Sequence, residues 1–156
     1  MDKTNVMRVL EQKGVPYTAY DYEDAHTTKG TEVAAVIGKD PGSVFKTLVT
    51  TGKSGDHYVF VIPVAEELDL KKAATAVKEK SIEMLPQKQL LPLTGYIHGG
   101  CSPIGMRKQF VTTFDETVIL YDTVAFSAGK IGHMVEISVE DISKVIDASY
   151  ADLTKE

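Results

Sequence analysis

Two apolar runs joined by the turn TGKSGD constrain the fold of this chain most strongly. The second run, His57 to Val64 (HYVFVIPV), is almost continuously apolar, which is typical of a strand covered on both faces. The first run, residues 44–50 (VFKTLVT), follows the turn signal Asp40-Pro41-Gly42 and also places large apolar groups on both of its faces. The sequence therefore predicts a largely buried β-hairpin.

Lys46 interrupts the first of these strands. In an extended conformation Val44, Lys46 and Leu48 point to the same face, so the lysine lies in an apolar row. An isolated ammonium is costly to bury unless another group pairs with it. The hairpin thus predicts a group that pairs with Lys46.

The remaining elements follow from apolar spacing and turn residues. We expect helices from Thr4 to Gly14, from an N-cap at Thr31 to Gly38, over residues 70–77, and from Val139 to Ile146. We expect strands over residues 17–22 and, after Gln109, in the runs QFVTTF, TVILYD, VAFSAG and HMVEIS, while residues 81–89 form a connector that ends in a helical turn. Short connections favour antiparallel pairing. The prediction is one α+β domain over residues 1–156, with a mixed, mostly antiparallel, barrel-like sheet flanked by helices.

Composition excludes several classes of protein. No apolar run approaches the roughly 20 residues of a transmembrane helix, and the N-terminus lacks the pattern of a signal peptide. The single cysteine, Cys101, excludes an internal disulfide. These features fit a cytoplasmic protein that does not bind membranes.

The net charge of −5 argues against a protein that binds nucleic acid mainly through bulk charge. Two local basic clusters could still contact a few phosphates, although solvated surface is the commoner role of such clusters. One cluster comprises Lys71, Lys72, Lys78 and Lys80, and the other is Arg107 with Lys108.

The segment Thr94 to Gly105, TGYIHGGCSPIG, is the most unusual local feature. Its four glycines allow the backbone to approach a ligand and present N–H groups to it, but the spacing is not that of a phosphate-binding loop. Cys101 lies three residues after His98, so a cysteine nucleophile is an alternative, although a small, inert thiol is commoner. The four histidines show no metal-ligand spacing, and we expect neither a metal nor a cofactor.

Five groups of residues, in this order along nearly the whole chain, resemble the YbaK/EbsC family, which is related to the editing domain of prolyl-tRNA synthetases. They are Tyr20-Asp21, Val44-Phe45-Lys46-Thr47-Leu48, Pro63-Val64-Ala65 with Leu68-Asp69-Leu70-Lys71-Lys72, Gly95-Tyr96 with Gly99-Gly100 and Ser102-Pro103-Ile104-Gly105, and Ser127-Ala128-Gly129-Lys130. The resemblance implies a barrel-like sheet with surrounding helices. It also implies a trans-editing deacylase that removes cysteine from the 3′ end of tRNA(Pro), with the substrate's own thiol as the nucleophile.

The resemblance also implies roles for individual residues. Lys46 would contact the terminal adenosine or its phosphate, and Gly99 would help to hold the carbonyl oxygen. The remaining substrate-binding residues that it implies are Tyr20, Thr47, Gly100, Ser102 and Ser127. Because a protein of net charge −5 holds tRNA weakly by itself, we expect prolyl-tRNA synthetase to act as its partner.

Some positions differ from those usual in the family. Lys29 replaces an aromatic residue, Met134 lies where a small polar or acidic residue is common, Cys101 replaces an aliphatic residue, and Ala128 replaces a glycine. These differences bear on the preferred amino acid. The alternatives are a deacylase for another ester such as alanyl-tRNA(Pro), a non-catalytic module that binds nucleotides or tRNA ends, and a hydrolase that uses Cys101.

Overall fold

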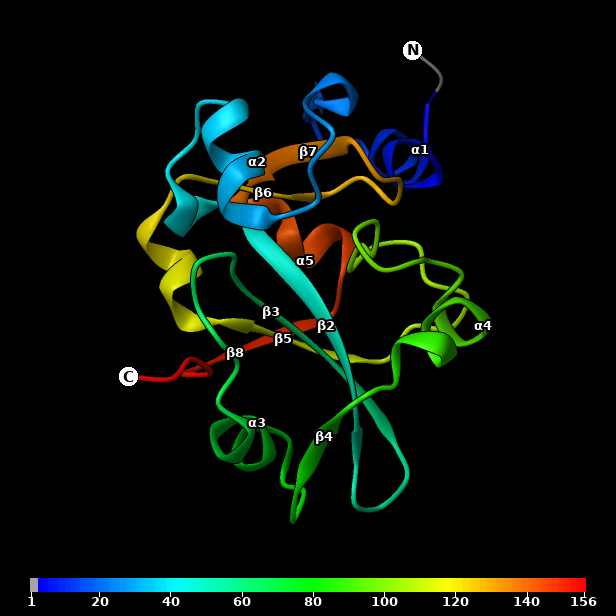
Figure 1. Ribbon diagram of the computed structural model, residues 1–156, viewed down its shortest axis with the longest axis vertical. Coiled ribbons are helices and arrows are strands. Elements are labelled where there is room, and N and C mark those ends of the chain that lie inside the picture. The colour runs from blue at the N-terminus through cyan, green and yellow to red at the C-terminus, as the bar shows by residue number, and fades with distance from the viewer. Residues whose placement is uncertain (1–2) are drawn as a thin grey trace.

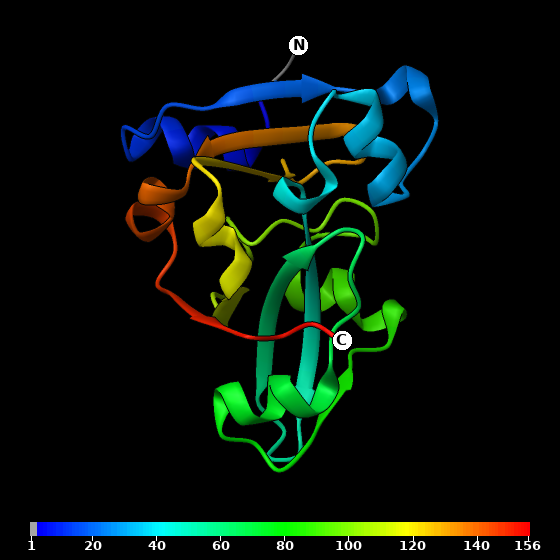
Figure 2. The same ribbon diagram turned by 90° about the vertical axis from the view of Figure 1, so that its left-hand side faces the viewer.

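The computed structural model describes residues 3–156 and contains two β-sheets with short helices around them (Figure 1). The smaller sheet is antiparallel, with the strand order β1 (Thr18–Asp21), β7 (His133–Ser138) and β6 (Thr123–Ser127). The larger sheet has the order β4 (Ile82–Met84), β2 (Phe45–Gly52), β3 (His57–Pro63), β5 (Val111–Asp115) and β8 (Ala148–Ala151). The strands of the smaller sheet run across the direction of β2 and β3 (Figure 2).

The predicted hairpin is confirmed as the antiparallel pair β2–β3, in which Lys46 lies opposite Ile62. Val59 to Ile62 are fully buried, because β3 is flanked by β2 and β5 and covered on both faces. A single parallel bridge between Val44 and Ala125 joins the start of β2 to the smaller sheet. This junction brings β2 and β6 together, and the cavity described below forms beside it.

The helices cover the outer faces and ends of the sheets. Their bounds are α1 (Asn5–Gln12), α2 (Gly30–Val36), α3 (Leu70–Val77), α4 (Leu90–Thr94) and α5 (Ile142–Val145). Five 3₁₀ turns complete the secondary structure: η1 (Glu23–Ala25), η2 (Pro41–Ser43), η3 (Gln87–Gln89), η4 (Glu116–Leu120) and η5 (Val139–Asp141). The longest helices within residues 3–156, α1 and α3, have eight residues each, too few to cross a bilayer.

Helix α1 shows how local sequence and packing agree. The Thr4 side chain accepts a hydrogen bond from Met7 N–H and caps the helix. The apolar stripe then buries Val6, Met7 and Leu10 in the main core between the two sheets. At the other end of the molecule, Asp69 caps α3, whose buried residues Ala73 and Ala74 pack with Phe60 and Ile62 of β3.

Two predicted elements differ from the structure. The run TVILYD is not a strand, because the Asp115 side chain accepts a hydrogen bond from Thr117 N–H and starts the 3₁₀ turn η4, which leaves Ile119 and Leu120 69% and 76% exposed. Thr31 is not the N-cap of α2. The helix begins at Gly30, and the capping position falls on Lys29, which has no side-chain cap hydrogen bond.

Two short edge strands were missed. Strand β4 lies within the segment predicted as a connector, and β8 follows the last helix. Four of the six strand pairings are antiparallel, so the mixed, mostly antiparallel α+β prediction is confirmed. The sheets do not close into a barrel, since β4 and β8 form the open edges of the larger sheet.

Candidate functional site

A cavity of about 240 Å³ lies beside the start of β2, where the two sheets meet. Its walls come from segments far apart in the sequence: the β1–α2 region, β2, the residue after β3, α4 with the glycine-rich loop that follows it, and the ends of β6 and β7. The lining residues are Tyr22, Thr28, Gly30, Val33, Phe45, Lys46, Thr47, Leu48, Val64, Leu90, His98, Gly99, Cys101, Ser127 and Met134. Most of these side chains are apolar, and the few polar groups among them can therefore orient a ligand.

Lys46 carries a positive charge into this cavity. The side chain is half-buried, and its Nζ donates a hydrogen bond to Val64 O at 3.4 Å. Burial lowers the pKa of the Lys46 ammonium, and the carboxylates of Glu67 and Glu66 oppose this shift. The same residue also lines a wider groove outside the cavity, so the lysine lies at an opening and not in a sealed core.

Thr47 supplies a further polar group. Its Oγ1 is buried and makes no hydrogen bond within the part of the chain that the structure describes. The residue nevertheless lines the cavity. A buried hydroxyl without a partner is unfavourable, and such groups are often completed by a ligand.

The glycine-rich loop reaches the cavity through Gly99. This residue has φ +87°, a conformation that favours glycine, and an added Cβ would lie 3.1 Å from Thr28 Cγ2. Its neighbour Gly100 does not line the cavity and donates its N–H to Ile97 O. Ser102 is fully buried behind the loop, where its Oγ accepts a hydrogen bond from Ile104 N–H. Of the three predicted loop residues, the structure therefore brings only Gly99 to the cavity.

Ser127 and Tyr20 occupy different positions. Ser127 lines the cavity at the end of β6, and its Oγ accepts a hydrogen bond from Gly129 N–H. Tyr20 is not among the lining residues, and its hydroxyl donates to Glu136 Oε1 at 2.7 Å. Two residues along, Tyr22 lines the cavity in its place. The alternation of the segment YTAYDY puts both tyrosines on one face, but only the tertiary structure selects Tyr22.

Cys101 and His98 both line the cavity, but no hydrogen bond joins them within residues 3–156. Burial raises the pKa of the Cys101 thiol to about 12, so the thiol is protonated at neutral pH. A thiolate is the nucleophilic form of cysteine. The cavity therefore holds Cys101 in its unreactive form.

Of the positions at which this chain differs from the family pattern, some line the cavity and others do not. Met134 lines the cavity from β7, opposite Tyr20 in the pairing of β1 with β7. Lys29 is exposed and lies outside the cavity lining, although its neighbours Thr28 and Gly30 belong to it. Gly30 allows close approach, since an added Cβ would lie 2.5 Å from Val64 Cβ. Sequence reasoning missed this wall because the spacing of a loop does not reveal which residues turn inward.

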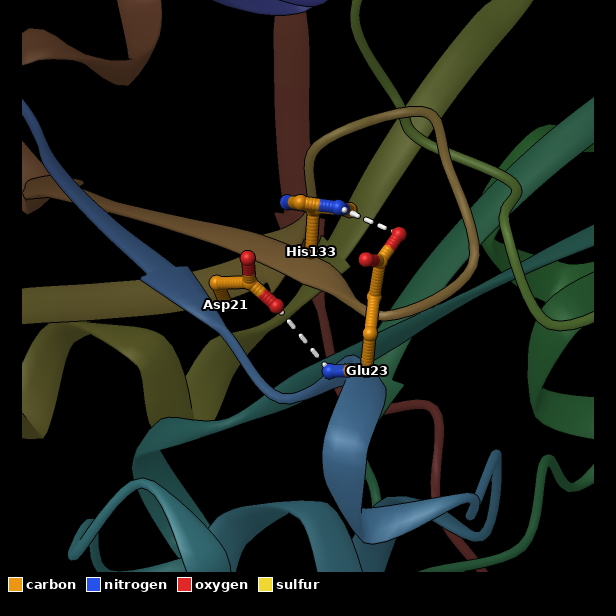
Figure 3. Close-up of side chains that lie close together, drawn as sticks. All are labelled: Asp21, Glu23 and His133. Carbon is orange, nitrogen blue, oxygen red and sulfur yellow. Dashed lines mark hydrogen bonds and ion pairs between the residues drawn. The ribbon is translucent and has the colours of Figure 1, made fainter. Parts of the chain in front are cut away.

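Asp21, Glu23 and His133 lie close together outside the cavity lining, and one ligand atom from each could together hold a metal ion (Figure 3). His133 Nε2 lies 3.0 Å from Glu23 Oε1, and Lys130 Nζ lies 3.6 Å from the same oxygen. The hydrogen bond with His133 and the charge of Lys130 hold the pKa of Glu23 below its usual range. Because the Lys130 ammonium already lies beside Glu23, the cluster acts as a network of a hydrogen bond and an ion pair, in which the hydrogen bond between Glu23 and His133 ties η1 to β7.

Comparison with known families gives a match over most of the chain. The family described as the aminoacyl-tRNA editing domain matches residues 23–145. This range contains every residue that lines the cavity except Tyr22.

A curated relative and two solved structures are also similar to the chain. A protein of Enterococcus faecalis, provisionally named Cys-tRNA(Pro)/Cys-tRNA(Cys) deacylase EbsC, is 45% identical over 153 residues, which cover 97% of this chain and 93% of the relative. A crystal structure of a hypothetical protein has 21% identity and a TM-score of 0.88 over 97% of this chain and 100% of that chain. Another, of a candidate trans-editing enzyme for prolyl-tRNA synthetase, has 24% identity and a TM-score of 0.83 over 99% and 100%. At these identities the two structures establish the shared fold.

Proposed function

Because the chain belongs to the aminoacyl-tRNA editing domain family, we propose that it is a trans-acting deacylase that hydrolyses cysteinyl-tRNA(Pro). The observation that carries this proposal is the cavity, in which Lys46, the unpartnered hydroxyl of Thr47 and the backbone of Gly99 surround an apolar space. The name of the 45% identical relative supports a cysteinyl ester as the substrate. No metal or cofactor takes part in the proposed reaction.

The proposed reaction begins with recognition of the tRNA end. Lys46 lies at the opening of the cavity, where its ammonium can contact the terminal adenosine or its phosphate. Thr47 follows on the same strand and offers its hydroxyl to the ribose. These contacts place the ester carbonyl next to Gly99.

In this proposal Gly99 stabilises the negative charge that develops on the ester carbonyl during the reaction. Attack on the ester converts the carbonyl oxygen into an oxyanion, and a backbone N–H that points at this oxygen stabilises the transition state. Gly99 N–H has no hydrogen-bond acceptor within residues 3–156, whereas Gly100 N–H is already bonded to Ile97 O. We therefore assign the donor to Gly99.

The nucleophile in this proposal is the thiol of the substrate. Its sulfur attacks the carbonyl carbon, the bond between that carbon and the 3′ oxygen of the ribose breaks, and the thiol proton ends on the ribose oxygen. Cysteine then leaves as a cyclic thioester, which water hydrolyses. Holding the thiol against the carbonyl can supply up to about 7–11 kcal/mol of the barrier in well-oriented intramolecular reactions.

The protonated state of Cys101 supports this assignment. With its pKa raised to about 12 by burial, Cys101 is a poor nucleophile at neutral pH. A reaction that requires a substrate thiol also discriminates between aminoacyl groups better than the size of the pocket does, because one methylene changes binding by only about 1–3 kcal/mol. Substrate selection and catalysis then depend on the same group.

In this proposal a partner protein selects the tRNA. The protein has a net charge of −5, which disfavours tight binding of tRNA. The relative's name includes both Cys-tRNA(Pro) and Cys-tRNA(Cys), which fits a domain that recognises the cysteinyl ester and not the tRNA body. We propose prolyl-tRNA synthetase as the partner that supplies tRNA(Pro).

The test is deacylation of cysteinyl-tRNA(Pro), alanyl-tRNA(Pro) and prolyl-tRNA(Pro) by the wild type and by Lys46→Ala and Lys46→Met. Cleavage of the cysteinyl ester alone, lost in both variants while their melting temperatures stay at or above that of the wild type, is the expected result. Equal cleavage of alanyl-tRNA would show that the substrate thiol plays no part. Binding of the tRNA end without any cleavage would make the protein a binding module.

A further inference from the structure

The segment from Met84 to Phe114 has a charge unlike that of the rest of the chain. All 22 Asp and Glu residues lie outside it, whereas Lys88, Arg107 and Lys108 lie inside it. None of these three cations forms a salt bridge with a carboxylate of residues 3–156. The segment is therefore the basic part of an acidic protein.

This segment folds into η3, α4 and the glycine-rich loop, which lie together on one side of the molecule (Figure 1). A groove of about 430 Å³ crosses them and is lined by Gln87, Lys88, Leu91, Ile97 and His98. His98 also lines the cavity, so the groove continues from the cavity along the surface. Leu91 and Ile97 are 47% and 50% exposed, a pair of apolar side chains with no cover in the described chain.

Arg107 adds a second cation to this side of the molecule. Its Nη1 donates to Pro92 O at 3.5 Å, which places the guanidinium against α4. Both Arg107 and Lys88 are exposed. We call the surface formed by Lys88, Leu91, Ile97, His98 and Arg107 the α4 face.

A second groove also meets the cavity, at Lys46 and Leu48, but its charges are balanced. Its lining includes the carboxylates of Glu67, Asp69 and Glu156 beside Lys71 and Lys155. Lys155 Nζ is already 3.3 Å from Glu67 Oε2. A phosphodiester would meet repulsion as well as attraction there, whereas the groove of the α4 face contains a lysine and no carboxylate.

We propose that the α4 face binds the single-stranded RNA immediately 5′ of the terminal nucleoside held in the cavity. This inference rests on the proposed function, because it names the path by which the substrate's RNA leaves the same site. Lys88 and Arg107 neutralise phosphates of this strand. Leu91, Ile97 and the imidazole of His98 form the platform on which an unpaired base packs, as single-stranded RNA bases do on apolar and ring-bearing side chains.

The proposal fits an acidic protein. Single-stranded RNA binding weakens with salt, and the log–log slope changes by about 0.7 for each phosphate that is neutralised. Two cations bind the RNA strand weakly enough for the tRNA to pass between this protein and the synthetase. They are also sufficient to orient the strand towards the cavity.

The experiment compares two substrates that differ only in the RNA 5′ of the ester. Cysteinyl-tRNA(Pro) extends over the α4 face, whereas 3′-cysteinyl-adenosine fills the cavity alone. For the double variant Lys88→Gln/Arg107→Gln we expect kcat/KM on the tRNA to fall about tenfold at low salt. We expect no change on the cysteinyl-adenosine. Leu91→Ser should show the same selective loss, and Lys53→Gln, in the distant β2–β3 turn, serves as the matched control.

Equal loss on both substrates would overturn the proposal, because the effect would then lie in the cavity. It would also be overturned if Lys53→Gln had the same effect, or if Lys71→Gln and Lys155→Gln had the larger one. A double variant that cleaves tRNA normally but loses its association with prolyl-tRNA synthetase would assign the face to a protein contact and contradict the proposal.

A binding assay decides the inference even if the proposed function fails. A fluorescent single-stranded RNA ending in CCA is titrated at several salt concentrations. The double variant should bind more weakly and reduce the salt slope by about 1.4. Unchanged affinity and slope would refute the α4 face as an RNA site, whereas absence of cleavage of either substrate by the wild type would refute only the deacylase.

Discussion

The unpartnered hydroxyl of Thr47 predicts that Thr47→Val stabilises the free protein and impairs its function. Thr47 Oγ1 is buried without a hydrogen bond in the described chain, and the residue lines the cavity. Valine keeps the branched shape of threonine and replaces the hydroxyl with a methyl group. The substitution therefore removes an unpaired polar group and changes the wall of the cavity very little.

The magnitude follows from the cost of leaving a buried hydroxyl unpaired, which is about 1–3 kcal/mol. Recovery of about 1 kcal/mol of this cost would raise the melting temperature by about 2–4 °C in a domain of this size. In the substrate complex, a rotation about the Cα–Cβ bond of threonine can turn the hydroxyl towards the ribose. Loss of that hydrogen bond, worth about 0.5–1.5 kcal/mol, would lower kcat/KM about two- to tenfold.

Thr50→Val is the matched control on the same strand. Thr50 is fully buried, but its Oγ1 donates to Tyr58 O at 2.9 Å. The same substitution there breaks a hydrogen bond and leaves the cavity untouched. We expect a lower melting temperature and unchanged kcat/KM on cysteinyl-tRNA(Pro).

Thermal unfolding and steady-state deacylation of both variants test the reasoning. Opposite signs of the two shifts in melting temperature are the expected result. A fall in melting temperature for Thr47→Val as large as that for Thr50→Val would show that Thr47 Oγ1 has a partner in solution. Unchanged kcat/KM for Thr47→Val would remove its role towards the substrate.

Three further predictions concern the other side chains at and beside the cavity. Gly99→Ala should lower kcat/KM at least about tenfold and cost about 1–2 kcal/mol in thermal unfolding, because alanine disfavours φ +87° and its Cβ would lie 3.1 Å from Thr28 Cγ2. Since alanine keeps the backbone N–H, wild-type activity would show that the reaction does not depend on the glycine conformation at this position. Cys101 should resist alkylation by iodoacetamide between about pH 7 and 9, because its pKa is about 12. The variant Cys101→Ala should keep deacylase activity within a few-fold of the wild type. Complete loss of activity in this variant would make Cys101 the nucleophile. Glu23→Gln should melt below the wild type at neutral pH, because the lowered pKa of Glu23 gives stability that is present above about pH 4.3 and lost as the pH falls through the folded-state pKa. A difference in melting temperature that persists at about pH 2 would point to a cause other than the hydrogen bond of Glu23 with His133 and its ion pair with Lys130.

Local sequence patterns were sufficient to predict the helices and strands whose formation depends on residues close together in the sequence. The hairpin of β2 and β3, the helix α1 and the span of α3 at residues 70–77 follow from periodicity and turn residues. Where apolar spacing was ambiguous, the prediction failed. The run TVILYD has the composition of a strand, but the capping hydrogen bond of Asp115 makes it a 3₁₀ turn.

The candidate site was predicted only in part. The apolar row around Lys46 predicted a partner for its ammonium, and the structure supplies the carbonyl oxygen of Val64. The resemblance to the family added Gly99, Thr47 and Ser127, all of which line the cavity. Tyr20, Gly100 and Ser102 belong to the same motifs but lie outside the lining, since a motif in sequence does not specify which of its side chains turn inward.

The sequence by itself determined the α+β class, the central hairpin and the need for a partner of the Lys46 ammonium. Only the tertiary structure decided that Tyr22 and Met134 share one wall and that the carboxylate-free segment from Met84 to Phe114 borders the cavity. The physical reason is the range of the interactions. Periodicity and capping act within a few residues, whereas the cavity depends on pairings such as Tyr20 with Met134, which lie more than a hundred residues apart and form only when the whole chain packs.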